Sequence, residues 1–174
     1  MSTREIAFVL VLIASPALAA ETPHLGIPSS PKDIAAWDIS VGPDGSNLPP
    51  GKGTVAQGAT LYQERCAACH GEKGEGKPSD RLVGGIGSLA TEQPVKTVGS
   101  YWPYATTLFD YIRRAMPLTE PQSLTNNEVY ALSAFVLNLN GIVGPKDVMN
   151  AKTLPKVKMP NREAFFIVYP GKID

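Results

Sequence analysis

The chain has 174 residues, and its 16 Lys and Arg residues balance 16 Asp and Glu residues. This length suits one domain with one core. The balanced charge includes no basic block and therefore gives no reason to expect nucleic acid as a partner. With 16 prolines and 16 glycines, many residues must lie in loops.

Residues 1–20 have the pattern of a secretory signal peptide. A polar start that contains Arg4 precedes an apolar run over residues 6–14, and Ala17-Leu18-Ala19 forms a small-residue cleavage site. The apolar run is shorter than the ~20 residues that span a bilayer, which argues against an uncleaved membrane anchor. We expect cleavage after Ala19 or Ala20. No later segment is long and apolar enough to cross a membrane.

Residues 21–53 are rich in Pro, Gly, Ser and Asp and show no helical period. We interpret them as an extended N-terminal arm that Trp37 and Ile39 fasten to the domain. A disordered linker is the alternative, and these two apolar side chains argue against it.

Two helices are predicted on either side of a long loop. Residues 55–67 follow Thr54, a suitable capping residue, and Gly58 within them indicates a close crossing with another element. Residues 106–115 form the second helix, which Pro117 ends because the residue before a proline is pushed out of the helical region.

The remaining segments are a loop, a third helix and a tail. Residues 71–97 are rich in glycine, and so long a loop in a compact domain is typical of a segment that wraps a ligand. Residues 124–140 show the clearest helical period, with a capping box of Thr125 and Glu128. Residues 142–174 form an irregular C-terminal extension, since four prolines prevent a long helix.

The segment Cys66-Ala67-Ala68-Cys69-His70 matches Cys-x-x-Cys-His, the attachment pattern of c-type haem. Two thiols three positions apart at a helix end can each add to one vinyl group of a haem. His70 then stands beneath the iron, where its imidazole can bind. The small residues between the cysteines let the backbone approach the ring.

Three other interpretations of this segment are weaker. A thioredoxin-like redox pair belongs to a strand-helix-strand pattern, which the sequence does not show. A zinc site needs a fourth ligand, and the only other histidine is His24 in the arm. A plain disulfide leaves His70 without an explanation.

The candidates for the sixth iron ligand are Met116, Met149, Met159 and His24. Met116 is preferred because it ends a helix, and the loop of residues 117–123 can bring its sulfur over the haem face opposite His70. Met159, which a proline follows, is the main alternative. A thioether ligand raises the reduction potential. A filled sixth position leaves substrate no place on the iron, which favours electron transfer over haem catalysis.

Several other side chains are candidates for roles around a haem. Two aromatic residues, Trp102 and Tyr104, are candidates to line the haem edge, with the indole N–H donating to a propionate; core packing is the alternative. Two arginines, Arg81 and Arg113, are candidates to pair with propionates; simple surface exposure is the alternative. Lys73, Lys77 and Lys96 either steer an acidic partner or are solvated loop residues. Phe165, Phe166 and Tyr169 either dock a partner subunit or cover the fold.

The order of these features resembles class I cytochrome c over residues 54–141. Within the resemblance, Gly58 and Tyr62 are similar to the first-helix residues that meet the last helix, and Leu132 and Phe135 are similar to their partners. The resemblance implies an all-α cytochrome c fold with one covalently attached haem c. Long irregular extensions then flank this domain at both ends.

A narrower resemblance rests on short segments along nearly the whole mature chain. They are Trp37-Asp38-Ile39, Pro43-Asp44-Gly45, Leu48-Pro49-Pro50-Gly51, Ser100-Tyr101-Trp102-Pro103-Tyr104-Ala105-Thr106, Arg113-Arg114-Ala115-Met116-Pro117, Pro121-Gln122-Ser123-Leu124 and Lys158-Met159-Pro160-Asn161-Arg162. These segments resemble two cytochromes of bacterial sulfur oxidation. One is the cytochrome subunit of sulfite dehydrogenase, and the other is the first haem domain of the sulfane dehydrogenase cytochrome subunit.

This resemblance implies a periplasmic protein that is not an enzyme on its own. It would take electrons from a molybdenum-cofactor dehydrogenase subunit and pass them to a downstream cytochrome c. The sulfane dehydrogenase subunit is usually longer, with a second haem domain, whereas this chain has one Cys-x-x-Cys-His segment and is closer to the single-haem type. Two alternatives remain open: an independent electron shuttle between respiratory enzymes, and a haem enzyme with an open or labile sixth ligand.

Overall fold

The computed structural model describes residues 25–166, which form two compact units divided after Trp37. The predicted signal peptide, His24 and Tyr169 lie outside the described residues. Within the described part of the chain, no helix has both the length and the apolar character needed to cross a membrane.

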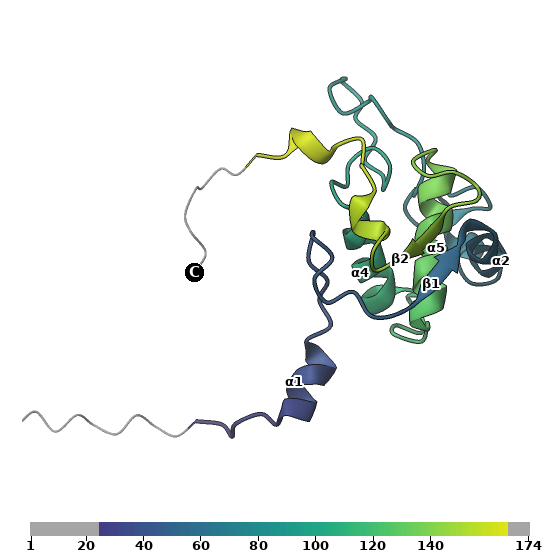
Figure 1. Cartoon of the computed structure of the whole chain (residues 1–174). Coiled ribbons are helices and arrows are strands. Elements are labelled where there is room, and N and C mark those ends of the chain that lie inside the picture. Colours follow the sequence, from purple (N-terminus) through teal and green to yellow (C-terminus); the bar gives the residue numbers. More distant parts are fainter. Residues whose placement is uncertain (1–24, 167–174) are drawn as a thin grey trace, which may run out of the picture. The chain divides into compact units, whose positions relative to one another are not determined.

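The first unit contains one short helix, α1, over Pro31–Trp37 (Figure 1). The Ser30 hydroxyl accepts a hydrogen bond from the Asp33 amide at 3.2 Å, and the Ser30 amide donates to the Asp33 carboxylate at 3.2 Å. This reciprocal capping and a proline at the first helical position both favour a helix. The prediction of an extended arm is therefore wrong over these residues. Trp37, predicted to be an anchor, is 86% exposed.

In the second unit, α2 (Val55–Arg65) and α5 (Asn126–Leu139) both begin with capping boxes. The Thr54 amide donates to the Gln57 side chain at 3.0 Å, and the Thr125 amide donates to the Glu128 carboxylate at 2.7 Å. The hydrogen bonds from Thr125 lower the pKa of the Glu128 carboxyl below its usual value. Each box satisfies backbone donors that a helix start leaves unpaired, so both predicted helix starts are confirmed.

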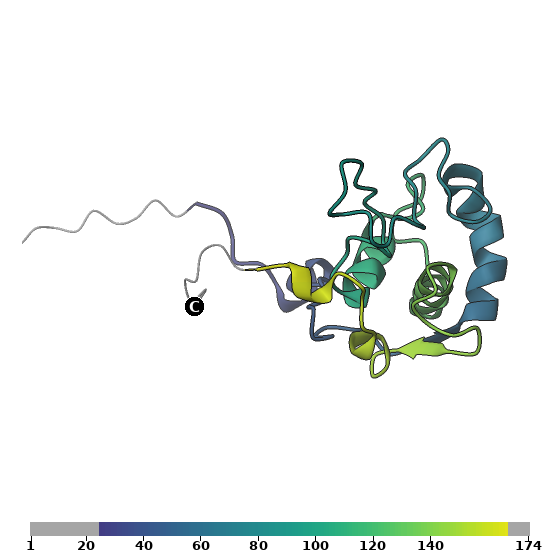
Figure 2. The ribbon, with the colours of Figure 1, turned by 90° about the horizontal axis from the view of Figure 1, so that it is seen from above.

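The two capped helices cross in close contact. Figure 2 shows α5 in green and nearly end-on, with α2 in blue on one side and α4 in teal on the other. A Cβ atom added at Gly58 would overlap the Ala131 carbonyl oxygen and would lie 2.7 Å from the Phe135 Cβ. Nearby, the rings of Tyr62 and Phe135 pack with their centroids 5.1 Å apart. The predicted close crossing at Gly58 is confirmed.

Helix α4 (Ala105–Ala115) packs against the other side of α5, where the rings of Phe109 and Tyr130 lie 4.4 Å apart. Its outer face holds the end of the N-terminal arm. The Asp110 carboxylate accepts a hydrogen bond from the Val41 amide at 3.0 Å, and Arg113 donates to the Ile39 carbonyl at 3.2 Å. The apolar anchor of this part of the arm is Val41, which packs against the core.

Two short strands join the flanking segments of the cytochrome-like region. Strand β1 (Lys52–Thr54) pairs antiparallel with β2 (Val148–Asn150), and Gly53 lies opposite Met149. Two 3₁₀ helices follow, η1 (Leu154–Lys156) and η2 (Arg162–Ala164). The fold is mostly helical, as predicted, but this sheet was not expected. Its strands are only three residues long and far apart in the sequence, so no local pattern indicates them.

Replacing Gly58 with alanine should destabilise the protein, because the added methyl group has no space at the crossing of α2 and α5. We expect the free energy of unfolding to fall by about 2 kcal/mol, as is usual for an overpacked contact. Guanidinium denaturation measures this change. The exposed neighbour Thr60→Ala is the control and should stay within about 0.5 kcal/mol of wild type. A G58A protein of wild-type stability would contradict the close crossing.

Candidate functional site

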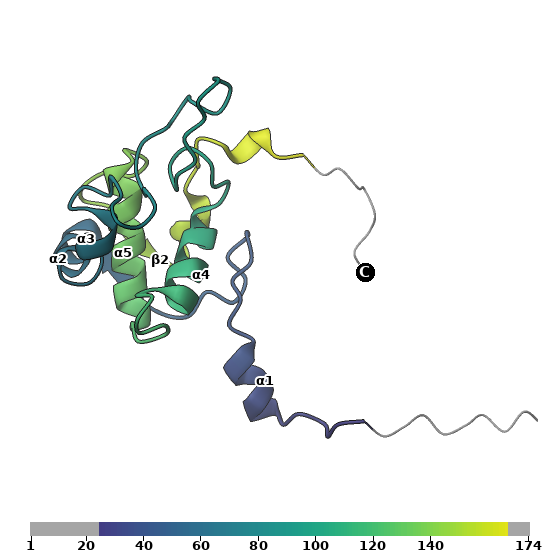
Figure 3. The ribbon, with the colours of Figure 1, turned by 180° about the vertical axis from the view of Figure 1, so that it is seen from behind.

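The segment Cys66–His70 is positioned by the end of α2. The Cys66 amide donates to the Tyr62 carbonyl at 2.9 Å and so completes the last turn of that helix. A short helix, α3 (Ala67–His70), follows at once, and the His70 amide donates to the Cys66 carbonyl at 3.0 Å. Figure 3 shows α3 beside the end of α2. Cys66 is therefore the junction between α2 and α3, and Cys69 lies within α3.

Neither cysteine forms a disulfide; Cys66 is half-buried and Cys69 is exposed. Burial raises the pKa of the Cys66 thiol to about 11, and the neighbouring Cys69 adds to this effect. Redox-active Cys-x-x-Cys pairs depend on a thiol of lowered pKa, because the thiolate is the nucleophile. The environment of Cys66 therefore argues against a thioredoxin-like role.

His70 has a defined orientation. Its ring Nδ1 lies 2.8 Å from the backbone carbonyl oxygen of Asp80. A carbonyl oxygen can only accept a hydrogen bond, so Nδ1 must carry the proton and donate it. The lone pair of the neutral ring is then on Nε2, the atom that is free to bind a metal. Sequence reasoning missed this partner, because any residue at position 80 supplies the same carbonyl group.

A glycine-rich loop brings the Asp80 carbonyl to the histidine. The Gly76 amide donates to the His70 carbonyl at 2.8 Å, and the Ser79 amide donates to the Cys69 carbonyl at 2.9 Å. Gly74 and Gly76 have φ angles of +72° and +84°, which strongly favour glycine. The loop predicted over residues 71–97 thus folds back on α3 and holds the His70 ring in one orientation.

The methionines differ in their surroundings. Met116 follows α4 directly, its amide donates to the Ile112 carbonyl at 3.1 Å, and it is half-buried at the edge of the core. Met159 is 3% exposed, and Met149 is 4% exposed within β2. Both of these side chains are members of the apolar core. Among the methionines of residues 25–166, Met116 is the one whose thioether is not enclosed in that core.

Three of the four residues predicted for the haem environment, Trp102, Tyr104 and Arg113, have other contacts in the structure. Trp102 packs edge-on against Tyr111 with ring centroids 5.8 Å apart. The guanidinium of Arg162 lies 4.2 Å from the ring centroid of Tyr104. Arg113 has five N–H donors, and one of them donates to the Ile39 carbonyl in the N-terminal arm. Their haem contacts remain predictions.

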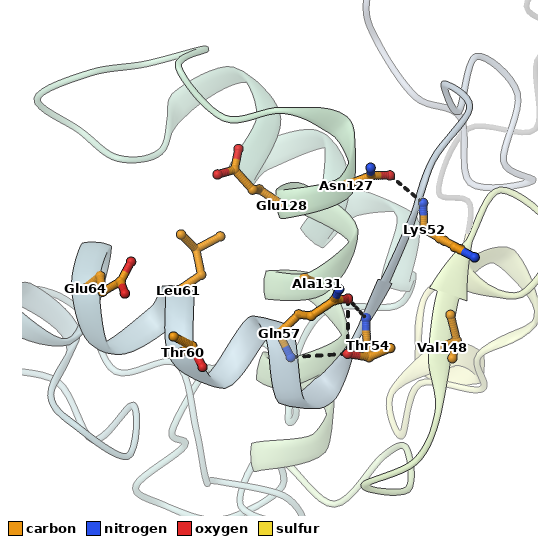
Figure 4. Close-up of a pocket in the computed structure, with 10 residues that line it drawn as sticks. All are labelled: Lys52, Thr54, Gln57, Thr60, Leu61, Glu64, Asn127, Glu128, Ala131 and Val148. Carbon is orange, nitrogen blue, oxygen red and sulfur yellow. Dashed lines mark hydrogen bonds between the residues drawn. The ribbon is translucent and has the colours of Figure 1, made fainter.

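A hollow of about 740 Å³ lies between α2, α5 and β1, but it is lined by none of the residues 66–70 (Figure 4). Its polar side chains hold secondary structure together: Asn127 accepts from the Lys52 amide at 2.9 Å, and Gln57 caps α2. Across the part of the chain described, no group of three or more His, Cys, Asp or Glu side chains could hold a metal ion. The zinc interpretation therefore gains no support.

Comparison with known proteins identifies the family. The family model for cytochrome c matches residues 55–140. A chain in the crystal structure of the sulfane dehydrogenase SoxCD from Paracoccus pantotrophus is 43% identical, with a TM-score of 0.78. The match covers 87% of this chain and 73% of that chain. The protein belongs to the class I c-type cytochromes. No match was found among curated protein sequences.

The protein is therefore a cytochrome c electron-transfer domain with extensions, and the predicted fold class is confirmed. Its family binds covalently attached haem c, and Cys66 and Cys69 have the spacing that attachment needs. The residues of the motif fit such a group. Two free thiols lie three positions apart, one at the cap of α3 and one within it, with small residues between them, and the adjacent imidazole presents Nε2.

Replacing both cysteines, Cys66→Ser together with Cys69→Ser, should abolish covalent haem attachment, because no thiol remains to add to the vinyl groups. Mass spectrometry of the denatured protein should show one haem adduct on the wild-type chain and none on the double variant. Ala68→Ser, which changes the exposed residue between the cysteines, should keep the adduct. A wild-type chain without any adduct would contradict the attachment site.

Proposed function

We propose that the protein is a periplasmic carrier of single electrons, with haem attached to Cys66 and Cys69 and with His70 and Met116 as axial ligands of the iron. The observation that supports this proposal most directly is the hydrogen bond from His70 Nδ1 to the Asp80 carbonyl at 2.8 Å. That bond selects the tautomer that an iron ligand requires and stops the ring from rotating. When bound, the haem supplies a reversible one-electron iron couple.

The two proposed axial residues have complementary effects. The imidazole of His70, oriented by the carbonyl, is a stronger electron donor than a free ring. The Met116 thioether stabilises the reduced state and raises the potential. A thioether in the sixth position also excludes substrate from the iron. Together these properties favour electron transfer and disfavour catalysis at the metal.

We further propose that the electron donor is a molybdenum-dependent dehydrogenase subunit that oxidises sulfite or another sulfur compound, and that a downstream cytochrome c is the acceptor. The similarity to a chain of a sulfane dehydrogenase supports the donor class. The match covers 87% of this chain. The uncovered remainder is shorter than the segment before residue 55 and shorter than the segment after residue 140. The similarity therefore extends into both flanks. The pattern of residues 1–20 supports export to the periplasm.

Two substitutions test the axial ligand. Met116→Ala should remove the sulfur-to-iron charge-transfer band of the ferric protein in the near infrared and turn the iron high-spin. Met159→Ala should keep that band but lower the free energy of unfolding by about 2–5 kcal/mol, because it leaves a cavity in the core. The opposite result would assign the ligand to Met159. A wild-type protein without the band would favour a haem enzyme with an open site.

The partner is tested by purification of the tagged, full-length protein from the periplasm. We expect a molybdenum-containing subunit to co-purify in a constant ratio, and sulfite or a sulfane substrate to reduce the haem of the complex. Absorption spectroscopy of the haem measures that reduction. If no such subunit co-purifies, and several unrelated dehydrogenases reduce the haem at similar rates, the protein is an independent shuttle.

A further inference from the structure

The positive charge of the C-terminal extension is concentrated in a short stretch. Residues 146–162 contain five basic side chains and one acidic side chain, although the whole chain is balanced. The basic residues are Lys146, Lys152, Lys156, Lys158 and Arg162, and the acidic residue is Asp147. All of them are exposed. Asp147, and Glu163, which follows Arg162 directly and borders the same hollow as Lys156 and Lys158, offset only part of this charge.

These cations do not stabilise the fold through ion pairs. Between residues 25 and 166 the ion pairs are Arg65 with Glu120 and Arg114 with Asp110, and neither involves the extension. Basic side chains that lie close together repel each other and raise the free energy of the folded state. Structural stability therefore does not explain why they are grouped.

The backbone that carries the cations is held firmly on the domain. Leu154 is 0% exposed, and Met159 is buried in the same apolar core. The Asn161 side chain donates to the Tyr101 carbonyl at 2.8 Å, and the Arg162 guanidinium lies over the ring of Tyr104. Charges on a fixed backbone lose less entropy on binding than those on a free tail. The cations are therefore presented on the ordered surface of the domain and not on a disordered basic tail.

A cation from a distant part of the chain lies next to the same segment. The Lys96 ammonium group lies 5.0 Å from the centre of the Tyr101 ring. We call Lys96, Lys156, Lys158 and Arg162 the basic surface. The extension also contacts α4 through η1, and Met116 follows the last residue of α4. Figure 1 shows the yellow C-terminal segment running past α4.

We propose that the basic surface docks the acidic face of a redox protein that receives the electron and then leaves. This inference rests on the proposed function and identifies the surface that serves the acceptor. Exposed charges speed the encounter of two proteins and are screened by salt, as a transient partner requires. A permanent subunit interface is larger and more apolar. Most of the surface lies beyond the cytochrome c family segment, which ends at residue 140, so it is a feature of the extension.

The experiment measures oxidation of the reduced, haem-loaded full chain by stopped-flow spectroscopy. The acidic acceptor is oxidised plastocyanin, and a neutral quinone, benzoquinone, serves as the second oxidant. Lys156→Glu combined with Lys158→Glu should lower the second-order rate constant with plastocyanin at least about 10-fold at low ionic strength. The difference should vanish at roughly 1 M salt, where the screening length is about 3 Å. The rate with benzoquinone should not change.

The matched control is Lys73→Glu combined with Lys77→Glu, which alters the net charge equally in the exposed loop after His70. It should change the plastocyanin rate less than about twofold. The proposal is overturned if the two double variants slow the reaction equally, or if the effect of K156E/K158E is independent of salt. A wild-type protein that neither oxidant oxidises would instead overturn the proposed electron-transfer function.

Discussion

The contact of Gly53 and Gly58 with Ala131 is the constraint on which the rest of the domain depends. A Cβ atom at either glycine would overlap the backbone of α5 at this residue. Because both side chains are absent, β1 and the first turns of α2 can lie directly against α5. The axis of α2 is then fixed, and so is the place where the helix ends at Cys66. The position of the haem-attachment segment is thus determined by contacts near the opposite end of α2.

From that fixed point, the site is built mainly by the backbone. The carbonyl of Cys66 holds α3, the carbonyl of His70 holds the following loop, and the carbonyl of Asp80 holds the His70 ring. Glycines with positive φ angles let the loop return this sharply. Side-chain identity matters at only a few positions, which carry the thiols, the imidazole and the thioether. This division explains how a loop rich in glycine can still orient a ligand.

How much of this could be predicted from the sequence depends on the range of each interaction. The capping box of Thr125 and Glu128 joins residues three apart and was predicted, as was the close approach at Gly58. The same signal at Ser30 and Asp33 was present but overlooked, and it would have revealed α1. The carbonyl partner of His70 could not be predicted, because a backbone group has no residue-type signature. The haem contacts of Trp102, Tyr104 and Arg113 remain predictions.

The pairing of β1 with β2 has a consequence for the order in which the chain can fold. One strand precedes the haem-attachment motif, whereas its partner and the core residues Leu154 and Met159 follow it by a long stretch of chain. During synthesis from the N-terminus, Cys66 and Cys69 emerge well before the residues that complete the core. The attachment segment therefore passes through a stage in which its surroundings cannot yet close. In that interval Cys66, which the finished domain partly buries, is still accessible for haem attachment.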